Sequence, residues 1–337
     1  MEEVEPTVPY NERPERFLLF EYNRPAVLWY PFKVFEWAWK KIMRFVGPEY
    51  MAEYWATIML ISFPIASVAQ VFYSQNQTTF WIGATWGTTV GVIFGMYTAL
   101  GVSGAQMNPA VTLSLAIVGR FPWRKVPFYW LAQYLGAFTA AVIVYLYYYS
   151  AMNNFDGGSR EFNGVNETYR VWVTSPQPHV GNLNNMWDQF WSTFLLQFLT
   201  LAIFDKPNAG VPHYLRPIGV SLILFTLNVC FQYNCGAAMN PVRDFPPRCF
   251  VALFWGAEVF RVHDFYFYVP ILGPMIGGPV GTIAYIFFIE THHYPAHKPQ
   301  LAQQGSSKIS PVRNGKHDEG NNIQMTAIKD DSADNNL

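Results

Sequence analysis

Two similar stretches decide the fold of this chain: SGAQMNPAVTL, residues 103–113, and GAAMNPVRD, residues 236–244. In both stretches Asn precedes Pro, and an apolar run follows. Asn is a preferred N-cap, and Pro suits the first helical turn because its missing N–H has no intrahelical partner there. The sequence therefore predicts one short helix that begins at Asn108 and another that begins at Asn240.

Both short helices interrupt stretches that are apolar enough to lie at membrane depth. A broken helix is tolerated there only when it is buried in protein or lines a watery cavity. The N-terminus of a helix also carries the positive end of the helix dipole. Two such ends inside one membrane protein predict a pore or a binding site.

The composition is that of a membrane protein. Apolar residues make up 51% of the 337 residues and charged residues only 13%, whereas an ordinary soluble domain is about a quarter charged. The net charge of −1 excludes nucleic-acid binding as the main function. No metal-ligand spacing and no nucleophile–base pair stands out, so we expect no enzyme activity and no cofactor.

Six long apolar segments predict an all-α membrane protein, since each is near the ~20 residues that cross a bilayer core. The two Asn-Pro helices, 108–118 and 240–253, are too short to span and are expected to be re-entrant half-helices. We expect three regions: a cytoplasmic N-terminal segment (1–48), a membrane domain (49–290) and a disordered cytoplasmic tail (291–337). Within the first region, 32–46 fits an interfacial helix or a plain juxtamembrane linker. The six segments are 50–73, 80–101, 126–149, 187–204, 214–233 and 266–289.

Charge in the short connections predicts the orientation. Lys and Arg gather before the first span, after the first half-helix and between spans four and five, whereas 74–79 has none. By the positive-inside rule both termini are cytoplasmic, in a membrane that we expect to be the plasma membrane. The Asn-x-Thr sequons at Asn76 and Asn166 then fall outside, where glycosylation can reach them.

The chain also repeats itself. Glu53 stands four residues before Thr57 at the start of span one, and Gln189 stands four before Thr193 at the start of span four. Three spans and a half-helix therefore occur twice. An odd number of spans per repeat inverts the second copy, so the half-helices enter from opposite faces and meet tip to tip.

These features together resemble the aquaporins, or major intrinsic proteins, over roughly residues 50–290. Asp244 directly after Arg243 resembles the aquaglyceroporin branch, as do the stretches 119–137 and 243–260. The resemblance implies an aquaporin-like channel domain with six transmembrane helices, two half-helices and one pore per subunit of a homotetramer. It also implies passive passage of water, glycerol and other small neutral solutes, without ions or protons.

The resemblance further implies a constriction beside Arg243, and family spacing places its other positions at Thr88, Asn228 and Ala237. Glycerol channels usually have aromatic residues at the first and third of these positions, and water channels usually have His at the second. Thr, Asn and Ala at these positions, together with Arg243, therefore predict a constriction that is wider and more polar than in either type of channel. Such a constriction admits larger polyols or undissociated small acids. In another register, Trp86 or Tyr233 would supply an aromatic wall.

The remaining expectations concern residues around the two motifs. Asn108 and Asn240 are expected to cap their helices and to donate toward the lumen. Val242 stands where the family mostly has Ala, and Ala110 is the residue at that position of the first motif; its volume is expected to be added where the half-helix tips meet, spreading them slightly. Glu53 and Gln189 are expected to brace the loops that lead to the half-helices. Pro109, Pro241 and Asp244 complete the candidate set, the last as a partner of Arg248, as a residue that orders the loop, or as a surface charge.

Two other classes of protein fit parts of the pattern. An ion-coupled transporter also uses inverted repeats and half-helices, but it needs paired intramembrane charges for coupling. Beyond Glu53 and Arg243 the sequence offers none. A water-permeable protein with a mainly structural or junctional role is the second alternative.

Overall fold

A computed structural model describes residues 37, 40, 41, 47–75, 77–162, 164 and 167–293. The sequons at Asn76 and Asn166, most of the segment 32–46 and the tail beyond His293 lie outside these residues. All regular secondary structure in the described part is helical. The helical body lies within Met1–His292, and of the second unit, His293–Leu337, only His293 is among the described residues.

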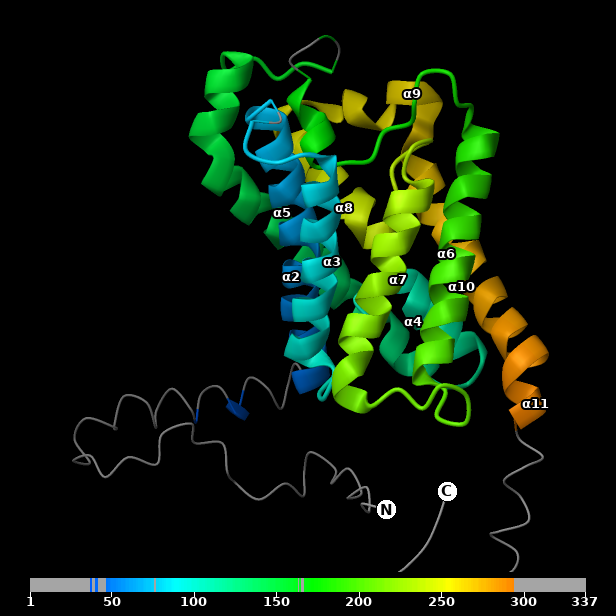
Figure 1. Cartoon of the computed structure of the whole chain (residues 1–337). Helices are drawn as coiled ribbons and strands as arrows, with labels where there is room; N and C mark the ends of the chain where they lie inside the picture. Colours follow the sequence, from blue (N-terminus) through cyan, green and yellow to red (C-terminus); the bar gives the residue numbers. More distant parts are fainter. Residues whose placement is uncertain are drawn as a thin grey trace, which may run out of the picture. The chain divides into compact units, whose positions relative to one another are not determined.

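Two short helices lie inside a bundle of longer ones, α8 in the upper half of the body and α4 in the lower half (Figure 1). The short helices are α4 (Pro109–Ile117) and α8 (Pro241–Phe254). The longer helices are α2 (Pro48–Tyr73), α3 (Trp81–Ala99), α5 (Val126–Asp156), α6 (Asn182–Phe204), α7 (Arg216–Phe231) and α10 (Val269–Tyr285). Two brief helices, α9 (Val262–Phe265) and α11 (Thr291–His293), precede and follow α10.

Four described helical stretches are long and apolar enough to cross a membrane. The sequence also predicts crossings by α3 and α6. α3 has only 19 residues, several of them Thr and Gly, and α6 opens with the polar run Asn182–Gln189, which lowers its mean hydropathy. The total of six spans stays a prediction. The four stretches are Pro48–Tyr73, Trp123–Asp156, His213–Phe231 and Val262–His293.

Packing partners follow the internal repeat. α2 packs along α3 and α5 in the first half, and α6 packs along α7 and α10 in the second. Each short helix packs against a long helix of the other half. α4, from the first half, contacts α10 of the second, and α8, from the second half, contacts α5 of the first. Each half therefore supplies part of the other's core, and the two halves fold as one body.

Two glycines show how closely the helices approach in the two halves. A Cβ on Gly136 of α5 would lie 2.5 Å from the carbonyl oxygen of Tyr54 on α2. A Cβ on Gly277 of α10 would overlap the carbonyl oxygen of Phe190 on α6 in the same way. Small residues at such crossings let backbones approach closely, which is the main source of helix association in lipid. The two crossings are equivalent in the repeat.

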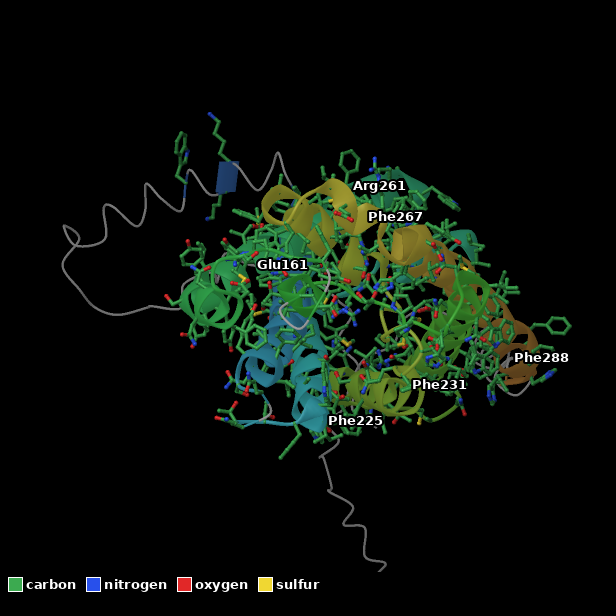
Figure 2. The ribbon with its side chains drawn as sticks, turned by 90° about the horizontal axis from the view of Figure 1, so that it is seen from above. Glu161, Phe225, Phe231, Arg261, Phe267 and Phe288 are labelled. Carbon is green, nitrogen blue, oxygen red and sulfur yellow. The ribbon has the colours of Figure 1, made fainter. Side chains whose placement is uncertain are left out.

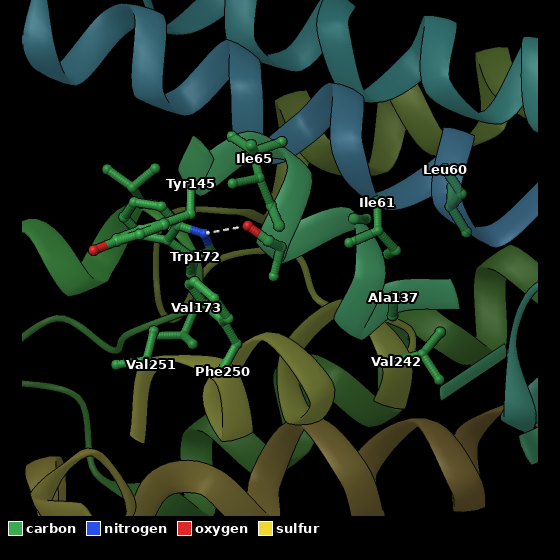
Figure 3. Packing of buried hydrophobic residues seen from close by; sticks show 14 of the residues in the cluster. Leu60, Ile61, Ile65, Ala137, Tyr145, Trp172, Val173, Val242, Phe250 and Val251 are labelled. Atoms are coloured by element: carbon green, nitrogen blue, oxygen red, sulfur yellow. Dashed lines mark hydrogen bonds between the residues drawn. The ribbon is translucent and has the colours of Figure 1, made fainter. Parts of the chain in front are cut away.

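The largest buried apolar cluster joins the first half to α8 and to the connection after α5. Trp172, fully buried, donates from its indole nitrogen to the carbonyl oxygen of Ala141 at 3.4 Å (Figure 3). Tyr145 and Phe250 pack beside it, with ring centroids 5.3 Å apart. This cluster fixes the connection that reaches Trp172 against the long helix α5, so that the segment becomes part of the rigid body.

Candidate functional site

Each short helix begins at an Asn whose side chain caps it. Asn108 accepts at Oδ1 from the backbone N–H of Ala110 at 2.9 Å, and Asn240 accepts from that of Val242 at 3.1 Å. Both Asn residues have extended backbones, the usual geometry of an N-cap. The helices therefore start at the residues that the sequence predicted.

The two caps also bind each other's loops. Asn108 donates from Nδ2 to the carbonyl oxygen of Met239 at 3.0 Å, and Asn240 donates to that of Met107 at 2.9 Å. The helix tips thus meet inside the body. A primary amide has two N–H groups, so each Asn keeps one donor beyond the contact between the tips.

A cavity of about 1050 Å³ passes both caps. Its walls come from α2, α3, α6 and α7 together with the loops before the two short helices. Seen from above, side-chain nitrogen and oxygen atoms gather around the middle of the body (Figure 2). The predicted orientation names the two ends of the body. The end that carries the connection 157–181 is called the outer end, and the end that carries the connection 205–215 is called the inner end. Lining residues lie toward both ends, from Tyr233 at the outer to Arg120 at the inner.

Of the two Asn-Pro motifs, only the Asn residues line this cavity. Pro109 and Pro241 are buried in the short helices, and Ala110 packs against Gly278 of α10. Val242, fully buried, belongs to the main apolar cluster. Its extra volume is therefore taken up by the core, and the tips stay within hydrogen-bonding distance. Val242 therefore does not prevent the hydrogen bonds between the tips, and the slight spreading expected from it stays a prediction.

All four residues of the predicted constriction lie on the wall of the same cavity. They are Thr88 of α3, Asn228 of α7, Ala237 and Arg243. Asn228 donates from Nδ2 to the carbonyl oxygen of Leu224 at 2.8 Å, which leaves its amide oxygen available. Thr88 donates to the carbonyl oxygen of Ala84 at 3.1 Å.

The two alternative aromatic residues differ in position. Trp86 is not among the lining residues; it is 48% exposed, and its ring lies against Phe225, with centroids 4.6 Å apart. Tyr233 does line the cavity, but it is 67% exposed at the outer end. Trp86 therefore does not replace an aromatic wall at Thr88.

Arg243 is held in place by a segment that the sequence did not mark as functional. Its Nη1 donates to the carbonyl oxygen of Trp172 at 2.9 Å. Val173, Thr174 and Ser175 line the cavity next to this carbonyl. The apolar run around Trp172, within a long polar connection, is the signal that could have marked the segment as buried.

Asp244 is part of a buried network, which excludes the role of a surface charge. It accepts from Nε of Arg248 at 2.7 Å and from both the N–H and Oγ1 of Thr174, at 2.7 and 2.6 Å. Arg248 donates in turn to the carbonyl oxygens of Thr174 and Val259, at 2.9 and 3.0 Å. The network ties α8 to the segment that holds Arg243.

The first loop is held by Glu53, which is fully buried on α2. Its Oε1 accepts from Ser103 Oγ at 2.7 Å and from the N–H of Gln106 at 2.8 Å. Its Oε2 accepts from the N–H of Met107 at 2.7 Å and from Gln133 Nε2 at 2.8 Å. Four donors satisfy a buried carboxylate that would otherwise be costly.

Gln189 holds the second loop from the equivalent place on α6. Its Oε1 accepts from the N–H of Met239 at 2.9 Å, and its Nε2 donates to the carbonyl oxygen of Gly236 at 2.8 Å. An amide suits this loop because it meets a backbone donor as well as acceptors, whereas Glu53 meets donors alone.

An ion pair lies on the cavity wall at the outer end. Glu167 and Arg170 approach to 3.0 Å. Burial raises the pKa of the Glu167 carboxyl above its ordinary value, while the nearby guanidinium opposes the shift. In the described part of the chain no cluster of three or more His, Cys, Asp or Glu could hold a metal ion.

Comparisons with known proteins agree with this geometry. The family model "Major intrinsic protein" matches residues 40–285. The chain is 38% identical to aquaporin-9 of Homo sapiens over 249 residues, 74% of this chain and 84% of the relative. It is 36% identical to aquaglyceroporin-2 of Rhizophagus irregularis over 244 residues, 72% of this chain and 77% of the relative. The X-ray structure of the aquaglyceroporin from Plasmodium falciparum matches with a TM-score of 0.67 at 27% identity, over 73% of this chain and 97% of that one.

Proposed function

The chain belongs to the major intrinsic protein family, and we propose that its cavity is the path of a passive transmembrane channel for water, glycerol and other small neutral solutes. The observation that carries this proposal is the pair of caps in one cavity. Asn108 and Asn240, from opposed helices, each keep a donor for a passing oxygen atom.

Electrostatics at the tips supports the exclusion of ions. The N-terminal ends of α4 and α8 meet there, and each carries a partial positive charge. Aquaporin-type pores are known to use this kind of barrier, in which the positive ends of half-helix dipoles and an Arg exclude protons and cations. Arg243 adds a full positive charge on the same wall.

The constriction beside Arg243 supports a wide solute range. Thr88 and Ala237 are small, and Asn228 is polar, so the ring combines volume with hydrogen-bonding groups. We therefore include larger polyols and undissociated small acids among the solutes. Swelling of proteoliposomes, followed by light scattering with water, glycerol, a six-carbon polyol, urea and a weak acid, tests this range.

A narrowed variant makes the test specific. Thr88→Trp combined with Ala237→Phe is expected to exclude the six-carbon polyol while water still passes. Thr226→Trp, on the exposed face of α7, is the control for a bulky substitution outside the cavity. An unchanged size limit in the narrowed variant would show that these positions do not form the constriction. Uptake that required an ion gradient would favour the coupled transporter.

The proposal includes a homotetramer in the plasma membrane with both termini in the cytoplasm. The large apolar side chains exposed along α3 and α6, among them Trp81, Ile82, Trp187 and Trp191, suit contact with lipid or with a second copy. Native mass spectrometry measures the subunit number. Loss of a glycosidase-sensitive mass in Asn166→Gln, with Asn76→Gln as the comparison, tests the outer location of the sequons.

A further inference from the structure

Gln197 on α6 is a buried polar side chain whose amide oxygen lacks a partner. It is 1% exposed, and it belongs to the lining of the cavity. No described residue binds its Oε1. Almost all buried polar atoms in proteins have a hydrogen-bond partner, either protein or water. Because Gln197 also belongs to the lining of the cavity, the contents of the cavity can supply this partner.

Most of the wall around Gln197 is apolar, although the polar residue Thr200 lines the cavity about one turn further along the same helix. Leu196, the preceding residue, packs with Met239 and Leu227, so Gln197 lies close to the level of the helix tips. It follows Gln189, which braces the outer loop, by eight residues, or about 12 Å along the helix toward the inner end. The apolar lining residues of the inner half are Val92, Met96, Leu201, Phe204, Val220 and Leu224.

We propose that Gln197 is a binding position for a hydroxyl group of a permeating polyol, on the inner side of the two caps. The proposal rests on the channel function proposed above and adds a residue to its specificity. The amide can accept a solute O–H at Oε1 and donate to a second solute oxygen from Nε2. Such a pair matches the adjacent hydroxyl groups of a polyol.

This position matters most for solutes larger than water. A polyol that enters the apolar stretch loses hydrogen bonds to water, and each unsatisfied polar group is costly there. A fixed amide replaces one of these bonds. Water is smaller and can keep hydrogen bonds to neighbouring water molecules, so its passage depends less on one side chain.

The test substitutes Gln197→Met, which keeps the length of the side chain and removes its amide. We expect glycerol permeability to fall by about three- to tenfold, the effect of one net hydrogen bond. Water permeability is expected to stay within about twofold. The glycerol concentration at which the glycerol flux saturates is expected to rise.

Ser192→Ala is the matched control. Ser192 lies on the same helix, is 1% exposed and has an unpartnered Oγ, but it does not line the cavity. We expect no change in the ratio of glycerol to water permeability in this variant. Gln197→Asn, which retains an amide on a shorter side chain, is expected to keep part of the glycerol preference.

The permeability results distinguish a failure of the proposed Gln197 site from a failure of the proposed channel function. If the wild type carries glycerol and Gln197→Met has an unchanged glycerol-to-water ratio, the binding position is wrong and the channel stands. If both permeabilities fall together in the Met and Asn variants, Gln197 is only structural. If the wild type carries no glycerol, the function proposed above fails, and this inference fails with it.

Discussion

The side-chain amide of Asn108 donates to the carbonyl oxygen of Met239, 3.0 Å away in the opposite half of the repeat. In the same way, the side-chain amide of Asn240 donates to the carbonyl oxygen of Met107 at 2.9 Å. Each helix tip is therefore positioned by the other, and neither half completes its own site. A change in one cap is expected to affect the loop of the other half.

Replacing Asn108 by Asp separates capping from donation. The carboxylate can still accept from the N–H of Ala110, but it cannot donate to Met239, and it adds a negative charge between two positive helix ends. We expect a measurable cation leak and a loss of about 1–3 kcal/mol in stability. Ion flux in proteoliposomes and thermal unfolding in detergent measure the two effects. Asn184→Asp, at an exposed position outside this cavity, should show neither.

Removing the charge of Asp244 is expected to destabilise the outer half. Asp244→Asn leaves Arg248, which is 1% exposed, as a buried charge without its counter-ion. Loss of one partner of a buried pair costs about 3–5 kcal/mol. The unfolding temperature should fall strongly, whereas Glu258→Gln, at an exposed position, should leave it unchanged. Combining Asp244→Asn with Arg248→Met should recover part of the loss; a strictly additive loss would argue against coupling.

The two loop braces are not expected to be interchangeable. Glu53→Gln places an NH₂ group opposite donors from Ser103, Met107 and their neighbours. Gln189→Glu places a carboxylate oxygen opposite the carbonyl of Gly236. Each change leaves buried groups without partners and is expected to cost about 1–3 kcal/mol or more. Thermal unfolding and water permeability of both variants check this, and a fully active variant of either kind would contradict the assigned contacts.

A side chain at Gly277 should prevent close packing of α10 on α6. Gly277→Leu would collide with the backbone of Phe190, so we expect loss of folded protein in detergent chromatography. Gly181→Leu is the control, since a Cβ there meets nothing within 4 Å and its φ is negative. Normal elution of Gly277→Leu would show that the helices can separate at this crossing.

Local sequence was sufficient to predict both short helices. Asn followed by Pro dictates an N-cap and a first turn, and the structure begins α4 at Pro109 and α8 at Pro241. The repeat of Glu53 and Gln189 predicted equivalent roles in the two halves, and the structure places both side chains against the loops before the short helices. The family spacing also placed Thr88, Asn228 and Ala237, which all line the cavity.

Side-chain direction could not be read from local patterns. Val242 lies one residue from Arg243, yet it faces the apolar cluster while Arg243 faces the cavity. The segment at Trp172 lies about 70 residues before Arg243, and nothing in its own sequence names the guanidinium that its carbonyl holds.

The sequence by itself determined the helices, their breaks and the twofold repeat, since these depend on hydrophobic length, capping and chain order. Only the tertiary structure decided which donors meet which acceptors: the exchanged bonds of Asn108 and Asn240, the network of Asp244 and the unpartnered amide oxygen of Gln197. These contacts join residues far apart in the chain, and their formation depends on how closely the helices pack.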